Sequence, residues 1–154
     1  MTTSSVDTIT LTIPNNTEYV GVVRLAVSGV AARMNFSLDD VENIKIAVSE
    51  ACSNAVQYAY GTDSGLITVE CTVHSDHLGI SISDNGQGFD TTAPIKPKNF
   101  DDPNESDIGL GLGMTFIKCL MDDVRITSNK GTGTCVEMIK KVPKIEKEAA
   151  KATT

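Results

Sequence analysis

Three short clusters of polar and small residues have the types and spacing that chemistry requires, and the first is a Glu–Asn pair. Glu50 and Asn54 stand four positions apart in SEACSNAVQYAY, so a helix places them one turn apart on the same side. A solvent-exposed polar face is the ordinary interpretation of such a pair. Here small residues surround it at Ala47, Ala51 and Ala55, which indicates a closely packed neighbour. A carboxylate and an amide so placed can act as a general base and a metal ligand.

The second cluster is SDNGQGF, residues 83–89, at the end of an expected strand. A DNG sequence is common in simple chain reversals. This one, however, leads into a long loop and not into a partner strand. A carboxylate at the end of a buried strand, Asp84, can accept a hydrogen bond from a planar base, while Gly86 and Gly88 let the backbone approach closely.

The third cluster is a run of alternate glycines, Gly109, Gly111 and Gly113, where a helix is expected to begin. Glycine is a poor helix former, so a purely structural turn does not require three of them. Backbone N–H groups at a helix N-terminus bind anions, and small residues let phosphate oxygens reach them. Because the spacing is neither GxxxxGK[ST] nor GxGxxG, the sequence predicts a phosphate site of another kind.

The elements that must position these clusters follow from the hydrophobic pattern. Alternating apolar and polar residues predict strands over 8–13, 67–73, 78–83, 124–128 and 134–140, with hairpin turns at 74–76 and 129–133. Helical spacing predicts helices from Thr17 to Arg33, from Leu38 to about Tyr60, and from just after the glycines at 109–113 to about Met121. We expect Ser37 to cap the second helix, Leu38 to begin its apolar stripe and Gly61 to end it.

The loop at 89–108 separates the second and third clusters. A structureless loop of about 20 residues in a compact domain is either a disordered linker or a functional lid, and glycine motifs on both flanks favour a lid. The chain of 154 residues suits a single domain, residues 1–141. Residues 142–154 are predicted to be a basic, disordered tail.

Composition excludes several classes of protein. The net charge of −7 disfavours direct binding to nucleic acid, since phosphate contacts require clustered Lys and Arg. The absence of a signal peptide and of an apolar run of about 18 residues predicts a cytoplasmic protein without membrane contact. The four cysteines are expected to be reduced core thiols, because they lie in apolar segments without a CxxC pair: Cys52, Cys71, Cys119 and Cys135.

The order ExxxN, DxGxG, long loop and GxGxG resembles the GHKL (Bergerat) ATP-binding fold of gyrase-type ATPases, histidine kinases and some heat-shock chaperones. Within that superfamily, EYVGVVRLAVSGVAARM, IKIAVSEACSNAVQYAY and CLMDDV are similar to the bacterial anti-sigma factor serine-protein kinases of the anti-sigma-B type. The similarity covers about residues 8–141. It implies an α+β fold with a mixed, mostly antiparallel sheet, helices packed on one face of it, and a homodimer.

The resemblance also implies roles for individual residues. Glu50 matches the catalytic carboxylate, Asn54 the Mg²⁺ ligand, and Asp84 the aspartate that binds the adenine amino group. The remaining matches are the glycines of the adenine turn, the glycines that face the triphosphate, and a threonine near the adenine: Gly86, Gly88, Gly109, Gly111, Gly113 and Thr134. Partner contacts are expected near the first helix, where Arg24 is the candidate.

Two features depart from the family. Tyr58 stands where many relatives carry histidine, and the expected lid contains no arginine, its only cations being Lys96 and Lys98. The position of Tyr58 is therefore without an assigned role. Which group, if any, offsets charge on the transferring phosphate is an open question at this point.

The resulting functional hypothesis is a serine-protein kinase that is also an anti-sigma factor. It would bind and inhibit an alternative sigma factor and use Mg²⁺-ATP to phosphorylate a serine of an anti-anti-sigma antagonist protein. One alternative is a binding-only anti-sigma protein with a structural nucleotide, against which Glu50 argues. The other is a histidine-kinase-type catalytic domain acting in trans, which ranks lower because the two histidines, His74 and His77, lie at a hairpin and not on a dimerisation helix.

Overall fold

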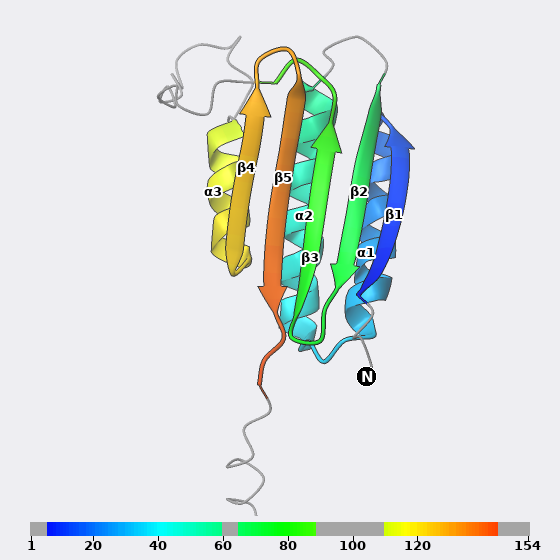
Figure 1. Ribbon diagram of the computed structural model, residues 1–154, viewed down its shortest axis with the longest axis vertical. Helices are drawn as coiled ribbons and strands as arrows, with labels where there is room; N and C mark the ends of the chain where they lie inside the picture. The colour runs from blue at the N-terminus through cyan, green and yellow to red at the C-terminus, as the bar shows by residue number, and fades with distance from the viewer. Residues whose placement is uncertain (1–5, 60–64, 89–109, 145–154) are drawn as a thin grey trace, which may run out of the picture.

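A five-stranded sheet forms the centre of the computed structural model, which describes residues 6–59, 65–88 and 110–144. The strand order is β1-β2-β3-β5-β4, and all four neighbouring pairs are antiparallel (Figure 1). The five predicted strands and both hairpins are confirmed, each strand being slightly longer than expected. Their bounds are β1 (Asp7–Pro14), β2 (Leu66–Val73), β3 (His77–Asp84), β4 (Asp123–Asn129) and β5 (Gly133–Lys141).

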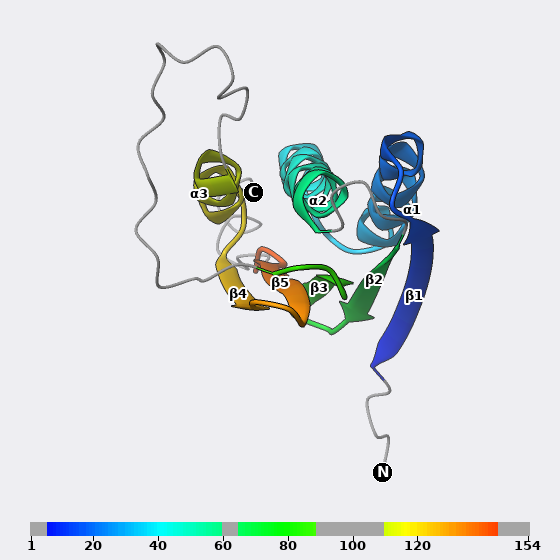
Figure 2. The same cartoon turned by 90° about the horizontal axis from the view of Figure 1, so that it is seen from above.

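Three α-helices cover one face of this sheet, as the view along the strands shows (Figure 2). They are α1 (Val20–Ala32), α2 (Leu38–Tyr58) and α3 (Leu110–Leu120), and a 3₁₀ turn, η1 (Thr17–Tyr19), precedes α1. The α+β class and the packing of helices on one face are therefore confirmed. The described strands form an antiparallel sheet where the resemblance implied a mixed one. No described helix is long and apolar enough to cross a membrane.

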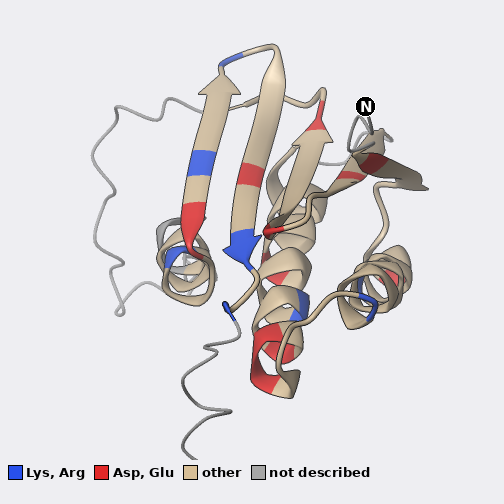
Figure 3. Cartoon of the chain, turned by 60° about the horizontal axis from the view of Figure 1, so that its bottom comes forward, with Lys and Arg blue, Asp and Glu red and all other residues tan. Residues whose placement is uncertain are grey.

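The N-terminus of α2 is fixed by a capping box. The Ser37 hydroxyl accepts the N–H of Asp40 at 3.1 Å, and the Asp40 carboxylate accepts the N–H of Ser37 at 3.4 Å, as the sequence predicted for the cap. Figure 3 shows acidic residues gathered at this end of the helix, where they stabilise the positive end of its dipole. The expectation that Leu38 belongs to the apolar stripe is wrong, because its side chain is 86% exposed in a first turn that extends beyond the core.

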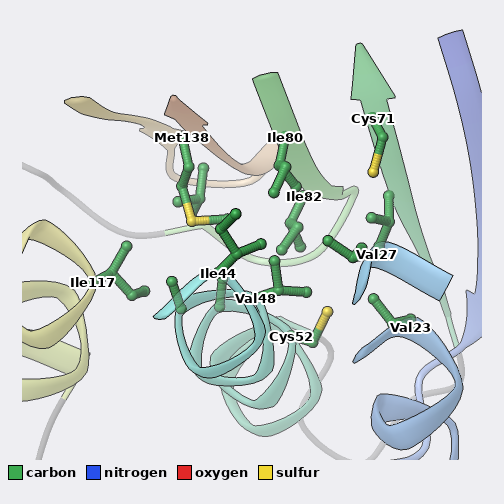
Figure 4. Packing of buried hydrophobic residues seen from close by; sticks show 14 of the residues in the cluster. Val23, Val27, Ile44, Val48, Cys52, Cys71, Ile80, Ile82, Ile117 and Met138 are labelled. Carbon is green, nitrogen blue, oxygen red and sulfur yellow. The ribbon is translucent and has the colours of Figure 1, made fainter. Parts of the chain in front are cut away.

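The core lies between the sheet and the three helices, with α2 at its centre (Figure 4). Ile44, Val48 and Cys52 of α2 are fully buried. They pack among residues of the sheet and of the other two helices, including Ile80, Ile82, Met138, Val27 and Ile117. Burial of each large aliphatic side chain contributes about 1.5–3 kcal/mol. This packing holds α2 against the sheet and so fixes the positions of the polar residues that α2 carries.

The prediction that all four cysteines are core thiols is half right. Cys52 and Cys71 are buried, and burial raises the pKa of their thiols to about 12 and about 11. Cys135 is only partly buried, and Cys119 is exposed on α3. Cys119 follows the buried Ile117 by two positions, which turns it to the outer face of the helix. None of the four forms a disulfide.

Two predicted helix boundaries are corrected. The first helix begins as a 3₁₀ turn, and α3 begins at Leu110, so that Gly111 and Gly113 lie within its first turns and not before it. The expected lid at 89–108, Gly61, Gly109 and the tail from residue 145 lie outside the described residues. The proposed division into a domain at 1–141 and a tail at 142–154 remains a prediction.

A buried lysine joins three elements at the end of the sheet where β5 finishes. Lys140 donates from Nζ to the carbonyl of Leu120 at 2.8 Å, at the end of α3, and its Nζ lies 3.8 Å from an oxygen of Asp40 at the start of α2. Replacing Lys140 with alanine should lower the free energy of unfolding by about 1.5–3 kcal/mol, because it removes a charge-assisted, part-buried hydrogen bond to the Leu120 carbonyl. Urea denaturation measures this loss.

Lys141→Ala is the matched control for that change. The Lys141 side chain is exposed, and only its backbone N–H is bonded, to Asp122 at 2.6 Å. Its removal should change stability by no more than about 0.5 kcal/mol. Equal unfolding midpoints for the two variants would contradict the role given to Lys140.

Candidate active site

Asp84 ends β3 on the face of the sheet that the helices cover. Ile80 and Ile82 precede it on the same face of β3, and both are buried. Asp84 therefore places a carboxylate at the end of a line of buried apolar side chains. Asp84 is 9% exposed, and its Oδ1 accepts the N–H of Gly86 at 2.9 Å and that of Thr134 at 3.3 Å. Both hydrogen bonds to described residues end on Oδ1, which leaves Oδ2 available to a ligand.

Burial sets the acidity of this carboxyl group. Removal from water raises the pKa of Asp84 above its ordinary value, and the N–H groups of Gly86 and Thr134 offset part of that rise. The carboxylate is therefore a desolvated acceptor held in place by backbone donors. Such a group is suited to recognising a planar base that carries an N–H donor.

Glycines allow the turn after Asp84 to be packed between two other segments. A Cβ atom at Gly86 would overlap the carbonyl of Ala59 at the end of α2, and one at Gly88 would overlap that of Asn129 at the end of β4. Gly88 also has φ +65, which disfavours other residues. Gly133, which the sequence assigned to the hairpin turn and not to the site, has φ +109, and a Cβ atom there would overlap the carbonyl of Asp84.

Gln87 is the second residue that the sequence analysis missed. Its backbone N–H and its side-chain amide each donate at 2.6 Å, to the carbonyls of Ala59 and Tyr58 at the end of α2. Its own carbonyl accepts the N–H of Gly131 at 2.6 Å, from the β4–β5 turn. Gln87 thus joins the Asp84 turn to both neighbours. Its place between two glycines, in GQG, was the only signal in the sequence.

A cavity of about 140 Å³ lies beside this turn, between α2, the sheet and α3. It brings Asp84, Thr134, Gly88 and Asn54 together, as the sequence predicted for residues of one site, and it also reaches Tyr58. The other lining residues are mostly small or apolar: Ala51, Ala55, Ala59, Ile82, Gln87, Met114 and Val136. An apolar slot with one buried carboxylate at its side has the character of a site for a heterocyclic base.

The Glu–Asn pair of α2 faces the start of α3. A Cβ atom at Gly113 would lie 3.1 Å from Asn54 Nδ2 and 3.5 Å from Glu50 Oε2, so only glycine lets α3 approach at this distance without displacing the amide. Asn54 Nδ2 is buried without a hydrogen-bond partner among the described residues. An unsatisfied buried amide beside a helix start indicates a missing polar ligand. Gly111 lies in the first turn of the same helix, whereas Gly109 is outside the described residues.

Glu50 also borders a second hollow, a groove of about 330 Å³ between α1 and α2. Arg24 of α1 lies on its other side, and Glu42 pairs with Lys45 within it at 2.9 Å. Among the described residues, neither Glu50 nor Arg24 takes part in an ion pair. The half-buried Glu50 therefore lies between Gly113 at the start of α3 and a groove on the protein surface.

The two histidines lie at the opposite end of β3 from Asp84. Their rings are stacked with centroids 4.0 Å apart, and His77 Nδ1 lies 2.6 Å from an oxygen of Asp76. Both side chains are partly buried. In the described part of the chain, no group of three or more His, Cys, Asp or Glu residues is arranged to hold a metal ion.

Comparisons with known proteins agree with this arrangement. Residues 13–140 match the family described as histidine kinase-like ATPase domains. The serine-protein kinase RsbW of Bacillus velezensis is 43% identical over 135 residues, which cover 83% of this chain and 82% of that protein. The RsbW of Bacillus cereus strain ATCC 10987 is also 43% identical, over 126 residues that cover 80% of this chain and 79% of that protein.

Solved structures support the fold. The RsbU and RsbW domains of Rv1364c from Mycobacterium tuberculosis superpose with a TM-score of 0.63 at 22% identity, over 87% of this chain and 32% of that one. This chain therefore spans about a third of that longer protein. The histidine kinase domain of the blue-light activated kinase EL346 from Erythrobacter litoralis gives a TM-score of 0.52 at 24% identity, over 84% of this chain and 62% of that one.

Proposed function

Because the chain belongs to the RsbW serine-protein kinases, within the family of histidine kinase-like ATPase domains, we propose that it phosphorylates a serine of an antagonist protein and also binds and inhibits an alternative sigma factor. It is an ATP-dependent protein serine kinase. The observation that carries the proposal is the position of Glu50, which borders the groove beside Arg24 and lies, with Asn54, against Gly113 of α3. A carboxylate there can meet both a nucleotide and a protein segment.

The nucleotide occupies the cavity at the Asp84 turn in this proposal. Oδ2 of Asp84 accepts from the adenine amino group, and Gly86 and Gly88 let the turn that holds this carboxylate pack against the ends of α2 and β4. The triphosphate points toward the first turn of α3, where the N–H of Gly111 has no partner within the helix and Gly113 carries no side chain that would hinder the phosphates. Gly109 would extend the same site.

Asn54 is the residue that would hold Mg²⁺. Its amide oxygen, Oδ1, lies 3.4 Å from where a Cβ atom at Gly113 would be and is the kind of ligand that a hard cation takes together with phosphate oxygens and water. Its buried Nδ2, which has no partner among the described residues, can donate to a phosphate oxygen. When bound, the ion neutralises charge on the transferring phosphate. Asn54 itself orients the phosphates by this contact, and the glycines at the start of α3 bind them through the backbone.

Protein partners would dock at the groove between α1 and α2. Its Arg24 guanidinium and Glu50 carboxylate have no ion-pair partner among the described residues, so an incoming segment can pair with the arginine while its serine hydroxyl approaches the carboxylate. Glu50 would take the proton of that hydroxyl as it attacks the terminal phosphate of ATP; ADP leaves, and the phosphoserine forms. We further propose a cytoplasmic homodimer with its kinase domain at residues 1–141.

Competition between the two partners tests this function. With the sigma factor and the antagonist both present, ATP should favour the antagonist, which is phosphorylated on serine and released, and ADP should favour the sigma factor. Such a switch requires about 1–3 kcal/mol of coupling between nucleotide and partner. Identical partner preference in ATP and ADP, without serine phosphorylation, would favour the alternative of an anti-sigma protein that only binds and whose nucleotide is structural.

Removing the amide of Asn54 should abolish Mg²⁺ binding without abolishing recognition of the adenine. Asn54→Ala is expected to lose the increase in ATP affinity that Mg²⁺ causes, while its weaker affinity in the absence of Mg²⁺ stays close to that of the wild type. Calorimetry with and without Mg²⁺ measures both values. Ser53→Ala, on the exposed side of the same turn, is the matched control and should behave as the wild type. Full Mg²⁺ dependence in Asn54→Ala would exclude Asn54 as the ligand.

A further inference from the structure

The row of residues that contains Asp84 continues across two more strands. Asp84 of β3 is opposite Thr134 of β5, and Thr134 is opposite Ser128 of β4. The preceding row on this face is apolar, with Ile82 opposite Val136 and Val136 opposite Ile126. Ser128 is 8% exposed and does not line the cavity, whereas Thr134 does. The apolar face of the sheet therefore ends in a row of three polar residues, Asp84, Thr134 and Ser128, of which Ser128 does not line the cavity.

Within the β4–β5 hairpin the Ser128 hydroxyl contacts Thr134 and Gly133, and it has one proton to donate. Its Oγ lies 2.7 Å from Thr134 Oγ1 and 3.3 Å from the carbonyl of Gly133. Hydroxyl hydrogen bonds are strongest near 2.7–2.8 Å, so the contact to Thr134 is the strong one and the contact to Gly133 is weak. Loss of the weak hydrogen bond to the Gly133 carbonyl therefore costs little free energy.

Two proton arrangements follow from these contacts. If Ser128 donates to the Gly133 carbonyl, Thr134 donates to Ser128 and offers the cavity only an acceptor. If Ser128 donates to Thr134, the Thr134 proton is free to point into the cavity as a donor. In both cases the bond to Ser128 restricts the rotation of the Thr134 hydroxyl. The group to which Ser128 donates thus decides whether Thr134 is a donor or only an acceptor toward the cavity.

We propose that Ser128 is a positioning residue for adenine recognition: it donates to Thr134 and so makes the Thr134 hydroxyl a donor toward N1 of the base. This inference rests on the proposed ATP site. The edge of adenine offers a donor, the N6 amino group, beside an acceptor, N1. Asp84 supplies the acceptor and Thr134 the donor, in the matching order. A 6-oxopurine carries an acceptor, O6, in place of the amino group and a donor, N1–H, in place of N1. It therefore mismatches both Asp84 and Thr134.

The experiment combines a protein change with deletion of a single ligand atom. ATP and 1-deaza-ATP, which lacks N1, are titrated into the wild type and into Ser128→Ala by calorimetry. We expect Ser128→Ala to weaken ATP by about 3- to 10-fold, as for one hydrogen bond, and 1-deaza-ATP by less than about 2-fold. Thr132→Ala is the control, since its hydroxyl donates to the Asn129 carbonyl at 3.1 Å in the same turn but lies outside the cavity.

A matched pair guards against a purely structural loss. Ser128→Thr and Ser128→Val have the same shape and differ only in the hydroxyl, so the threonine variant should keep the preference for ATP over 1-deaza-ATP and the valine variant should lose it. Equal weakening of both nucleotides, no weakening, or equal behaviour of this pair would overturn the role of Ser128. Failure of the wild type to bind ATP would instead overturn the proposed function.

Discussion

Glu50→Ala should bind ATP with nearly the affinity of the wild type but transfer phosphate to the partner serine roughly 10²- to 10⁴-fold more slowly, the range expected when a general base is lost. The structure separates Glu50 from nucleotide binding, because Glu50 lines the groove with Arg24 and not the cavity at Asp84. Its Oε2 lies 3.5 Å from where a Cβ atom at Gly113 would be, close to the start of α3 at which we propose that the phosphates bind.

Radiolabelled transfer to the antagonist, measured beside ATP calorimetry, checks this expectation. Glu50→Gln is the informative companion, since glutamine keeps the size of the side chain and one acceptor oxygen but is not a base. Both variants should therefore be slow. A fast Glu50→Gln enzyme would assign Glu50 to positioning, and a fast Glu50→Ala enzyme would remove it from the reaction.

The strands and hairpins could be predicted because their signals are local. Alternation in β2 and β3 and glycines with positive φ in the β4–β5 turn act within a few residues of one another. Helix boundaries were less certain because tertiary contacts decide them. The helix α3 includes Gly111 and Gly113, since the gain in approaching Asn54 closely outweighs the poor helix propensity of glycine.

The residues of the candidate site also fall into two groups, those with a local sequence signal and those whose role depends on tertiary contacts. Asp84, Asn54, Thr134 and Gly88 could be grouped from motifs, and the structure places them around one cavity. Gln87, Gly133 and Ser128 could not, because their importance depends on contacts between segments far apart in the chain. Gln87 contacts the end of α2 and the β4–β5 turn, and Gly133 packs against the Asp84 carbonyl. A residue type alone does not reveal such contacts.

Asp84→Asn should lose ATP affinity by about 1–3 kcal/mol, which is roughly 5- to 150-fold, without loss of folding. Asparagine keeps the oxygen that accepts the N–H groups of Gly86 and Thr134, so the turn remains held. Its amide nitrogen, however, would replace Oδ2 and place a donor against the adenine amino group. Asp122→Asn is the matched control, because Asp122 also accepts a backbone N–H, that of Lys141, but is exposed and remote from the cavity.

The pKa of Asp84 adds a pH dependence that the same two variants can test. Burial raises this pKa, so the folded protein takes up a proton more readily than the unfolded chain, and the ionised carboxylate disfavours folding at neutral pH. As the pH falls through the raised pKa, Asp84 should cease to oppose folding, while ATP affinity declines because the protonated oxygen no longer accepts from adenine. Asp84→Asn should lack both effects and be at least as stable as the wild type at neutral pH. Urea denaturation and calorimetry over a pH series measure the two trends, and an ATP affinity that falls equally with pH in wild type and Asp84→Asn would assign the titration to another group.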